Sequence, residues 1–350
     1  MTAAEMRMIT AADIDAAVDA GALDRTAADR LLAFIATSHN AGQADEENLR
    51  FITSFNDIFV SIGLGLFLGA LSYMARGLGA ALDASVVAIA AWGLAEIFTR
   101  RKRMALPSII LLAVFAVACL FACFFAFTGG SMWTIFTFTS SGARWPLLVA
   151  GLFAATMSAL HWFRFHVPIT IAAGVAGIAL AVIAISQMLF PDLLLTHSSI
   201  VLVPLGLVAF GIAMRFDMSD TARRTKRTDI AFWLHLLAAP FIVHPVVQEI
   251  GSFESLTVAQ ALAIVAMFVV LSVVALIVDR RALLASSLAY LGYAAFVLIS
   301  QAGWQASTAA AAIMAVGIVV LGLSVLWRPL RSALVKPLPD TLRARIPAPA

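Results

Sequence analysis

The feature that most constrains this chain is a series of apolar stretches, each near twenty residues long, that recurs from residue 57 to residue 327. A helix needs about 20 apolar residues to cross the hydrocarbon core of a bilayer, because each residue adds only about 1.5 Å. Only 12% of the residues are charged, whereas soluble domains carry about 25%. The sequence therefore excludes a water-soluble fold and predicts an all-α, polytopic bundle of transmembrane helices.

We count about ten spans, and the fourth and sixth are the shortest. They divide the chain into three predicted parts: residues 1–50 as an acidic cytoplasmic helical hairpin with its linker, residues 51–328 as the bundle, and residues 329–350 as a basic, proline-containing cytoplasmic tail. The approximate limits of the spans are 57–75, 82–99, 105–127, 145–162, 167–189, 197–214, 230–248, 257–277, 282–300 and 305–327.

The positions of lysine and arginine predict how the spans are threaded, because these residues accumulate in cytoplasmic loops. If the N-terminus is cytoplasmic, twenty-one of the twenty-three basic residues lie inside, and only Arg76 and Arg144 lie outside. An odd number of spans would destroy this asymmetry. Tryptophans near the span ends, such as Trp145 and Trp327, are interpreted as anchors at the membrane surface.

The first fifty residues differ from the rest in charge. They carry four arginines and nine acidic residues, which gives −5, whereas residues 51–350 carry +8. Capping boxes that start at Thr10 and Thr26 predict two short helices, at 11–20 and 27–38, with a turn at Gly21 between them. Such a hairpin is too small to hold itself firmly. We expect it to bind a protein partner or a second copy of the chain. Its predicted apolar face comprises Ile14, Val18, Leu23, Leu31, Leu32 and Ile35.

The seventh span is the most polar of the series. It contains two histidines and two prolines and ends in a glutamine and a glutamate. Prolines bend a helix and free backbone carbonyls, and histidine exchanges a proton near neutral pH. One interpretation is a kinked helix beside a polar cavity, and the other is that the histidines bond to neighbouring helices. The candidate residues are His235, Pro240, His244, Gln248 and Glu249.

Three further charged residues lie at span ends. Asp57 begins the first span and is expected to cap its free amides. Glu96 precedes Arg100 by four residues near the end of the second span, and this spacing favours an ion pair at the membrane surface.

Motifs for chemistry are sparse in this sequence. No pattern typical of a catalytic site, a nucleotide site or a metal site occurs, so we predict no cofactor, no metal and no catalytic residues, and an enzyme has no positive support. The basic residues form short clusters between spans, which argues against nucleic-acid binding. Cys119 and Cys123 are interpreted as packing residues. Gly65 and Gly69 form a Gly-x-x-x-Gly motif, and Gly177 lies among alanines, which favours close helix packing.

An acidic hairpin from Ile14 to Ile35, turning at Gly21 and followed by about ten spans, resembles bacterial families of predicted membrane proteins known only as domains of unknown function. The resemblance implies a protein of the bacterial cytoplasmic membrane and supplies no site residues. Two functions stay open. One is a non-enzymatic scaffold or sensor, with both chain ends cytoplasmic and a partner bound through the hairpin. The other is a permease for a small neutral or apolar solute, with a cavity beside the His235 and His244 helix.

Overall fold

The computed structural model describes residues 11–32, 55–130, 144–251 except 222 and 224, 256–302, 307–343 and 346. Within these ranges the chain is helical and contains no strand, which confirms the predicted all-α class. Contacts divide the chain into two units, of which the first ends at Asn48 and the second begins at Leu49.

The first unit contains two short helices. Helix α1 (Ala11–Asp19) leads into a turn in which Gly21 has a φ of +70°. A second helix occupies residues 25–32. Of the predicted apolar face, Ile14 is buried, Leu31 is 41% exposed, and Ile35 lies outside the described residues.

The start of the second helix differs from the prediction. Asp24, not Thr26, stands at the boundary, because the amide of Ala28 donates to the Asp24 carbonyl at 2.9 Å. The Thr26 hydroxyl donates to the Asp24 carboxylate, and this bond lowers the pKa of Asp24. The carboxylate of Asp24 is therefore the N-cap acceptor, and the predicted capping box at Thr26 does not form. Thr26 is instead the second residue of the helix.

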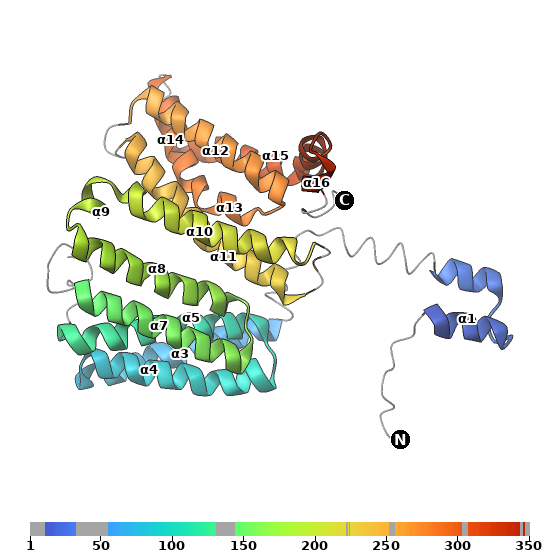
Figure 1. The fold of residues 1–350 in the computed structure, drawn as a ribbon, viewed down its shortest axis with the longest axis horizontal. Helices are drawn as coiled ribbons and strands as arrows, with labels where there is room; N and C mark the ends of the chain where they lie inside the picture. Colours follow the sequence, from blue (N-terminus) through green and yellow to red (C-terminus); the bar gives the residue numbers. More distant parts are fainter. Residues whose placement is uncertain are drawn as a thin grey trace. The chain divides into compact units, whose positions relative to one another are not determined.

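The second unit is a bundle in which nine helices of the described residues are long and apolar enough to cross a membrane. Figure 1 shows them side by side, with α10 and α11 between the helices of the first half of the bundle and α12 to α15. The chain is therefore a multi-pass membrane protein. The nine are α3 (Phe55–Ala75) with η1 (Arg76–Leu78), α4 (Ala80–Ala95) with η2 (Glu96–Arg101), α5 (Ala105–Thr128), α7 (Arg144–Phe165), α8 (Ile169–Leu189), α10 (Ser198–Met218), α11 (Lys226–Ile250), α12 (Val258–Val278) and α15 (Thr308–Val335).

The ninth predicted span, 282–300, is not one helix. It consists of the four-residue α13 (Ala282–Ala285) and the fifteen-residue α14 (Ser287–Gln301), with a break at Ser286. At about 1.5 Å per residue, α14 alone is about 22 Å long, less than the roughly 30 Å hydrocarbon core. Helix α13 packs against α11, and its Ala282, Leu283 and Leu284 are buried. The two helices together lead from the end of α12 to the start of α15 (Figure 1).

The last long helix extends beyond the predicted boundary of the bundle at residue 328. Helix α15 continues to Val335, and both Arg331 and Val335 are buried. The predicted tail therefore contributes two core residues, and its remaining described part holds the short α16 (Asp340–Arg343).

Close helix contacts occur at some of the predicted small residues and not at others. A Cβ at Gly177 of α8 would lie 2.8 Å from the carbonyl oxygen of Gly151 in α7, so these two helices touch through their backbones. In contrast, nothing lies within 4 Å of a Cβ at Gly65 or Gly69. The Gly-x-x-x-Gly of α3 therefore packs against no other described part of the chain.

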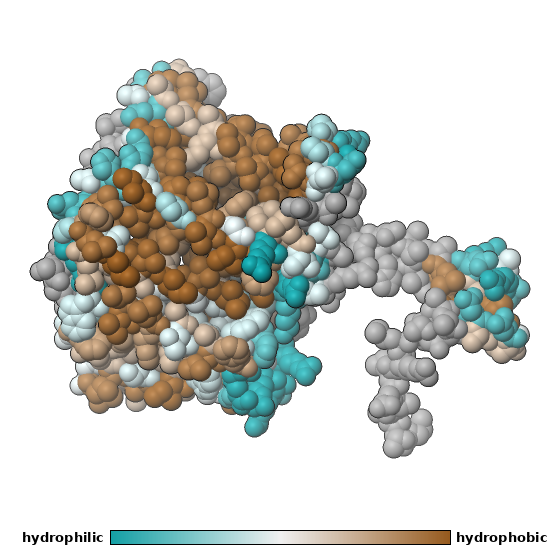
Figure 2. All heavy atoms as spheres, in the orientation of Figure 1, coloured by the Kyte–Doolittle hydropathy of each residue, from teal (hydrophilic) through white to brown (hydrophobic). Residues whose placement is uncertain are grey.

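The helices form two groups that meet along one seam. Helices α3, α4, α5, α7 and α8 pack together, as do α10 to α15, and apolar side chains of α8 contact α10 and α11 along the seam. Polar residues gather at the end of the bundle that carries the α4–α5 and α10–α11 turns, whereas the surface along the helices, between the two ends of the bundle, is hydrophobic (Figure 2). The basic turns of the sequence thus share one end, called here the basic end.

Candidate functional site

The polar residues predicted to share one cavity along α11 separate into two clusters. His235 belongs to a buried network toward the basic end, and His244, Gln248 and Glu249 belong to a more exposed cluster at the opposite end. Nine residues separate the histidines, which corresponds to about 13.5 Å along the helix. The two histidines therefore do not lie in one cluster, because each imidazole contacts a different set of neighbouring helices.

His235 is fully buried against α10. Its Nε2 lies 2.8 Å from Oδ2 of Asp217, the penultimate residue of α10, and its ring packs edge-on against Phe210 at 5.2 Å between centroids. Its Nδ1 is buried without a hydrogen-bond partner among the described residues. His235 therefore joins α10 to α11.

The Asp217 carboxylate also forms an ion pair with Arg280. The guanidinium of Arg280, which follows α12, donates through Nε to Oδ2 of Asp217 at 3.2 Å and through Nη2 to Oδ1. Nη2 also donates to the carbonyl of Thr228 in the first turn of α11 at 3.2 Å. Asp217 and Arg280 are 4% and 1% exposed, so both charges are removed from water.

Asp279, the neighbour of Arg280, organises the adjacent part of the network. Its φ of +63° is left-handed and ends α12, and its backbone amide donates to the carbonyl of Ala275. The Asp279 carboxylate accepts from Nε1 of Trp327 at 2.8 Å, and it pairs with Nη1 of Arg223 at 2.9 Å and with Nε of Arg331 at 3.3 Å. This one side chain therefore connects α12, α15 and the α10–α11 turn.

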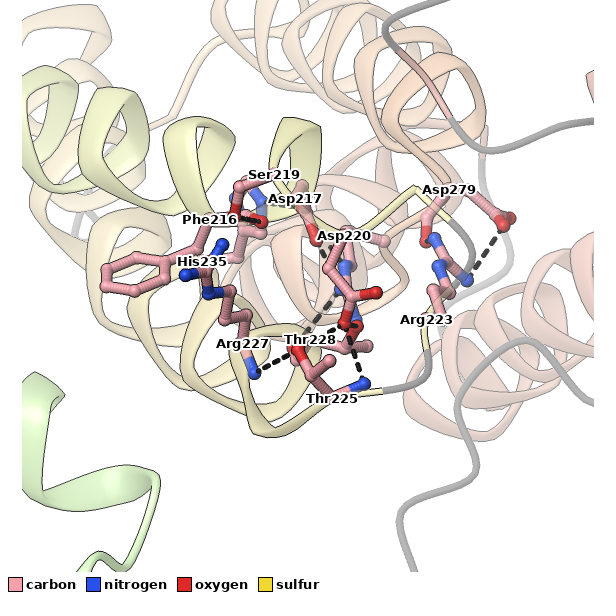
Figure 3. A network of polar contacts seen from close by, with 11 residues as sticks. Phe216, Asp217, Ser219, Asp220, Arg223, Thr225, Arg227, Thr228, His235 and Asp279 are labelled. Atoms are coloured by element: carbon pink, nitrogen blue, oxygen red, sulfur yellow. Dashed lines mark hydrogen bonds and ion pairs between the residues drawn. The ribbon is translucent and has the colours of Figure 1, made fainter.

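The α10–α11 turn is held by a further acidic residue. Asp220 Oδ2 accepts from the amide of Thr225 at 2.8 Å and from the hydroxyls of Thr225 and Thr228 at 2.6 and 3.1 Å (Figure 3). Thr225 in turn caps α11, because its hydroxyl accepts from the amide of Arg227. This turn places Arg223 beside Asp279.

Two carboxylates and two guanidiniums are thus buried, and the guanidinium of Arg223 is partly buried beside them. We call this set the charge network, and it comprises Asp217, Arg223, Asp279, Arg280 and Arg331 with His235 and Trp327. Burial lowers the pKa of Arg223, and Asp279 opposes that effect. Charges at such a depth are tolerated only when paired and hydrogen-bonded, because their desolvation costs several kcal/mol per ion. Ionisable groups within a bundle are functional candidates by default.

The second cluster lies at the other end of α11. Nδ1 of His244 bonds with the hydroxyl of Tyr290 in α14, and Nε2 lies 3.1 Å from the Gln248 amide nitrogen. The hydroxyls of Ser198 and Ser199 donate to Gln248 and Glu249 at 3.0 and 2.7 Å. These bonds join α11 to the start of α10, so Gln248 and Glu249 hold helix ends together.

Pro240 lies in neither cluster. It lines an apolar groove of about 540 Å³ between α11 and the first helix group, together with residues such as Trp233, Leu237, Ala173 and Ala176. No histidine or charged residue lines this groove. A cavity beside α11 therefore exists, but it is apolar and excludes both histidines.

Three other predicted residues lie in the first helix group. Glu96 pairs with Arg100 at 3.3 Å, as the spacing predicts, and also with Arg164 of α7 at 2.7 Å, a contact between distant segments that the spacing did not reveal. Asp57 is buried in the first turn of α3. His161 of α7, which the sequence analysis left out, is 1% exposed and bonds to the hydroxyl of Thr170 at 3.3 Å.

No metal centre is formed by the described residues, since no three of their His, Cys, Asp or Glu side chains gather in one place. Comparisons with protein-family models, with curated proteins and with solved structures found no match.

Proposed function

We propose that this chain is a non-enzymatic scaffold or sensor of the membrane that recruits a protein partner through its N-terminal unit. The observation that supports this most directly is the pairing within the charge network. Asp217, Asp279 and Arg280 are buried and bonded to other protein groups. Ionisable groups that are paired in this way hold helices together, which is a structural role.

The N-terminal unit supplies the recruiting surface in this proposal. Residues 1–50 carry a net charge of −5, and most described side chains of the hairpin are exposed. A strongly charged surface raises the rate of encounter with a partner of opposite charge. The partner would accordingly present a basic surface.

For the location, we propose a bacterial cytoplasmic membrane, with both chain ends in the cytoplasm. Lys102, Arg164, Lys226 and Arg281 lie in or directly beside the turns α4–α5, α7–α8, α10–α11 and α12–α13, and the positive-inside rule assigns an end with such turns to the cytoplasm. Reporter fusions after Arg103 and in the turn at Arg227 test this: both should report a cytoplasmic location, and a periplasmic signal from either would reverse the orientation.

The recruiting role is tested by crosslinking in intact membranes. A chain lacking residues 1–45 should lose the partner bands that the full chain gives. A matched control keeps the hairpin and neutralises three of its exposed carboxylates in D15N/D19N/D29N, and this variant should weaken recovery without abolishing it. Equal recovery from the full and the shortened chain would contradict the proposal.

A second candidate function is a permease for a small apolar solute. The apolar groove beside α11 favours it, since Pro240 interrupts the backbone bonding of the helix that forms one wall. In this case flux should fall when the groove is filled in A176F, whereas H235A and H244A should act only through stability. Unchanged flux in A176F would dismiss the groove as a pathway.

A further inference from the structure

The apolar groove runs along the seam between the two helix groups. On α8 its lining extends from Ile169 to Ile183, and on α11 it extends from Trp233 to Phe241. Fourteen residues of helix correspond to about 21 Å, whereas one leaflet of the hydrocarbon core is about 15 Å deep. The groove is therefore long enough to hold one entire hydrocarbon chain.

Apolar and aromatic side chains line the groove, so a ligand there is held by apolar contacts. Alanines at Ala172, Ala173 and Ala176 make the floor on α8, and leucines, a tryptophan and a phenylalanine form the walls. Beside the groove, α7 and α8 come into direct backbone contact at Gly151 and Gly177. A chain of methylenes matches this shape and this polarity.

One end of the groove reaches the basic end of the bundle. Ile169 is the first residue of α8, and Trp233 lies seven residues, or about 10 Å, from Lys226 at the start of α11. The Lys226 ammonium donates to the carbonyl of His166, in the α7–α8 turn, at 3.3 Å. This bond places a cation above the mouth of the groove, where α8 and α11 begin.

The Lys226 ammonium donates to a backbone carbonyl, and the carboxylate of Asp229, three residues along α11, lies close enough to interact with its charge. Lys226 makes no direct ion pair with a carboxylate in the part of the chain that the structure describes, whereas Arg164 and Arg100 are paired with Glu96. An ammonium at the membrane surface attracts an anionic lipid headgroup, with about 1 kcal/mol per basic residue.

We propose that the groove between α5, α7, α8 and α11 is a binding site for one anionic phospholipid, with an acyl chain along α8 and the phosphate at Lys226. This inference is independent of the recruiting role of the N-terminal unit: crosslinking tests that role, and lipid binding tests the site.

Native mass spectrometry of the full chain in mild detergent measures the site, with dioleoyl phosphatidylglycerol and dioleoyl phosphatidylcholine as probes. The unmodified chain should retain one phosphatidylglycerol in preference to phosphatidylcholine. In A173F/A176F two rings fill the groove, so this bound lipid should be lost. A70F, which places a ring on the exposed face of α3, should keep it. Retention of the lipid by folded A173F/A176F, or equal retention of the two lipids by the unmodified chain, would overturn the proposal.

The headgroup contact has its own variant. K226Q should reduce the preference for phosphatidylglycerol by roughly fivefold, since about 1 kcal/mol corresponds to that ratio. R76Q removes one positive charge at the other end of the bundle and should leave the preference unchanged. Equal effects of K226Q and R76Q would contradict a phosphate at Lys226.

A measurement on the unmodified chain avoids any question of misfolding. Trp233 lines the groove, so phosphatidylglycerol with a brominated acyl chain should quench its fluorescence more than brominated phosphatidylcholine does. The difference between the two lipids should disappear in W233F. Identical quenching by the two lipids in the unmodified chain would also reject the site.

Discussion

The indole of Trp327 donates its Nε1 proton to the carboxylate of Asp279 across 2.8 Å, and both side chains are almost completely buried. The indole also carries the guanidinium of Arg281 over its ring at 4.9 Å. A residue that resembles an interface anchor in the sequence is therefore a core residue, and it fastens α15 to the end of α12.

Replacing Asp279 should destabilise the bundle strongly. D279A removes the carboxylate that pairs with Arg223 and with the buried Arg331, and breaking a buried ion pair in this way costs about 3–5 kcal/mol. W327F removes one hydrogen bond to a charged group and should cost about 1.5–3 kcal/mol. Reversible unfolding of the purified protein in detergent measures both. W145F, at a tryptophan that is 45% exposed, serves as the control and should change little.

Asp217 and Glu96 both pair with arginines, but only Asp217 is buried, so their substitutions should differ. D217N keeps the shape of the side chain and leaves the Arg280 charge uncompensated, which should cost about 3–5 kcal/mol. E96Q breaks contacts that water and salt already screen, and the melting temperature should barely move. Similar losses from D217N and E96Q would show that the charge network contributes no more than a surface pair.

Glycines in this bundle should respond to alanine with opposite signs. G177A places a methyl group 2.8 Å from the Gly151 carbonyl, so α7 and α8 must separate, at a cost of about 1–3 kcal/mol. G69A meets nothing within 4 Å and gains helix propensity, so stability should stay constant or rise by up to about 1 kcal/mol. Melting temperatures of the two variants decide this, and a loss in G69A would reveal a contact made outside this chain.

The hairpin turn should depend on Gly21. With a φ of +70°, this residue occupies the left-handed region, where an added Cβ costs about 1–2 kcal/mol. G21A should therefore speed hydrogen exchange of the amides in α1 and residues 25–32 by roughly tenfold. A20S, at an exposed neighbour, is the control. Unchanged exchange in G21A would mean that the turn relaxes at no cost.

Much of the fold follows from local sequence properties. A run of about twenty apolar residues must form a helix in a bilayer, because no water is available to bond a free backbone. For this reason nine of the expected spans correspond to long helices of the described residues, with boundaries within a few residues except at the end of α15, which continues to Val335. The predicted span 282–300 is the exception: it follows Asp279 and Arg280, which bond within the charge network, and it is interrupted at Ser286.

The charge network could not be predicted from residue types alone. In the sequence, Arg280 and Arg331 indicate only cytoplasmic charge, and Asp217 at the end of an apolar stretch belongs to no motif. Their pairing depends on α10, α12 and α15 being adjacent, which is a property of the tertiary fold. One signal was available: Asp217 and Asp279 are isolated carboxylates at the ends of spans, each close in sequence to arginines.

The partners of the two histidines of α11 also depend on the tertiary fold and could not be predicted from the sequence. His235 and His244 lie on one helix but in separate clusters. Which neighbours each imidazole would meet was set by Asp217 and Tyr290, residues from two other helices.

The break at Ser286 constrains how the chain is built. Backbone that leaves the helix at membrane depth is tolerated only where protein surrounds it, and α13 finds that surrounding on α11. Helix α14 alone is too short to cross the hydrocarbon core, so the segment from Ala282 to Gln301 depends on its contacts with α11 and α12. We therefore expect this segment to enter the bilayer only after α11 and α12 are in place, which would give the second half of the protein an order of assembly.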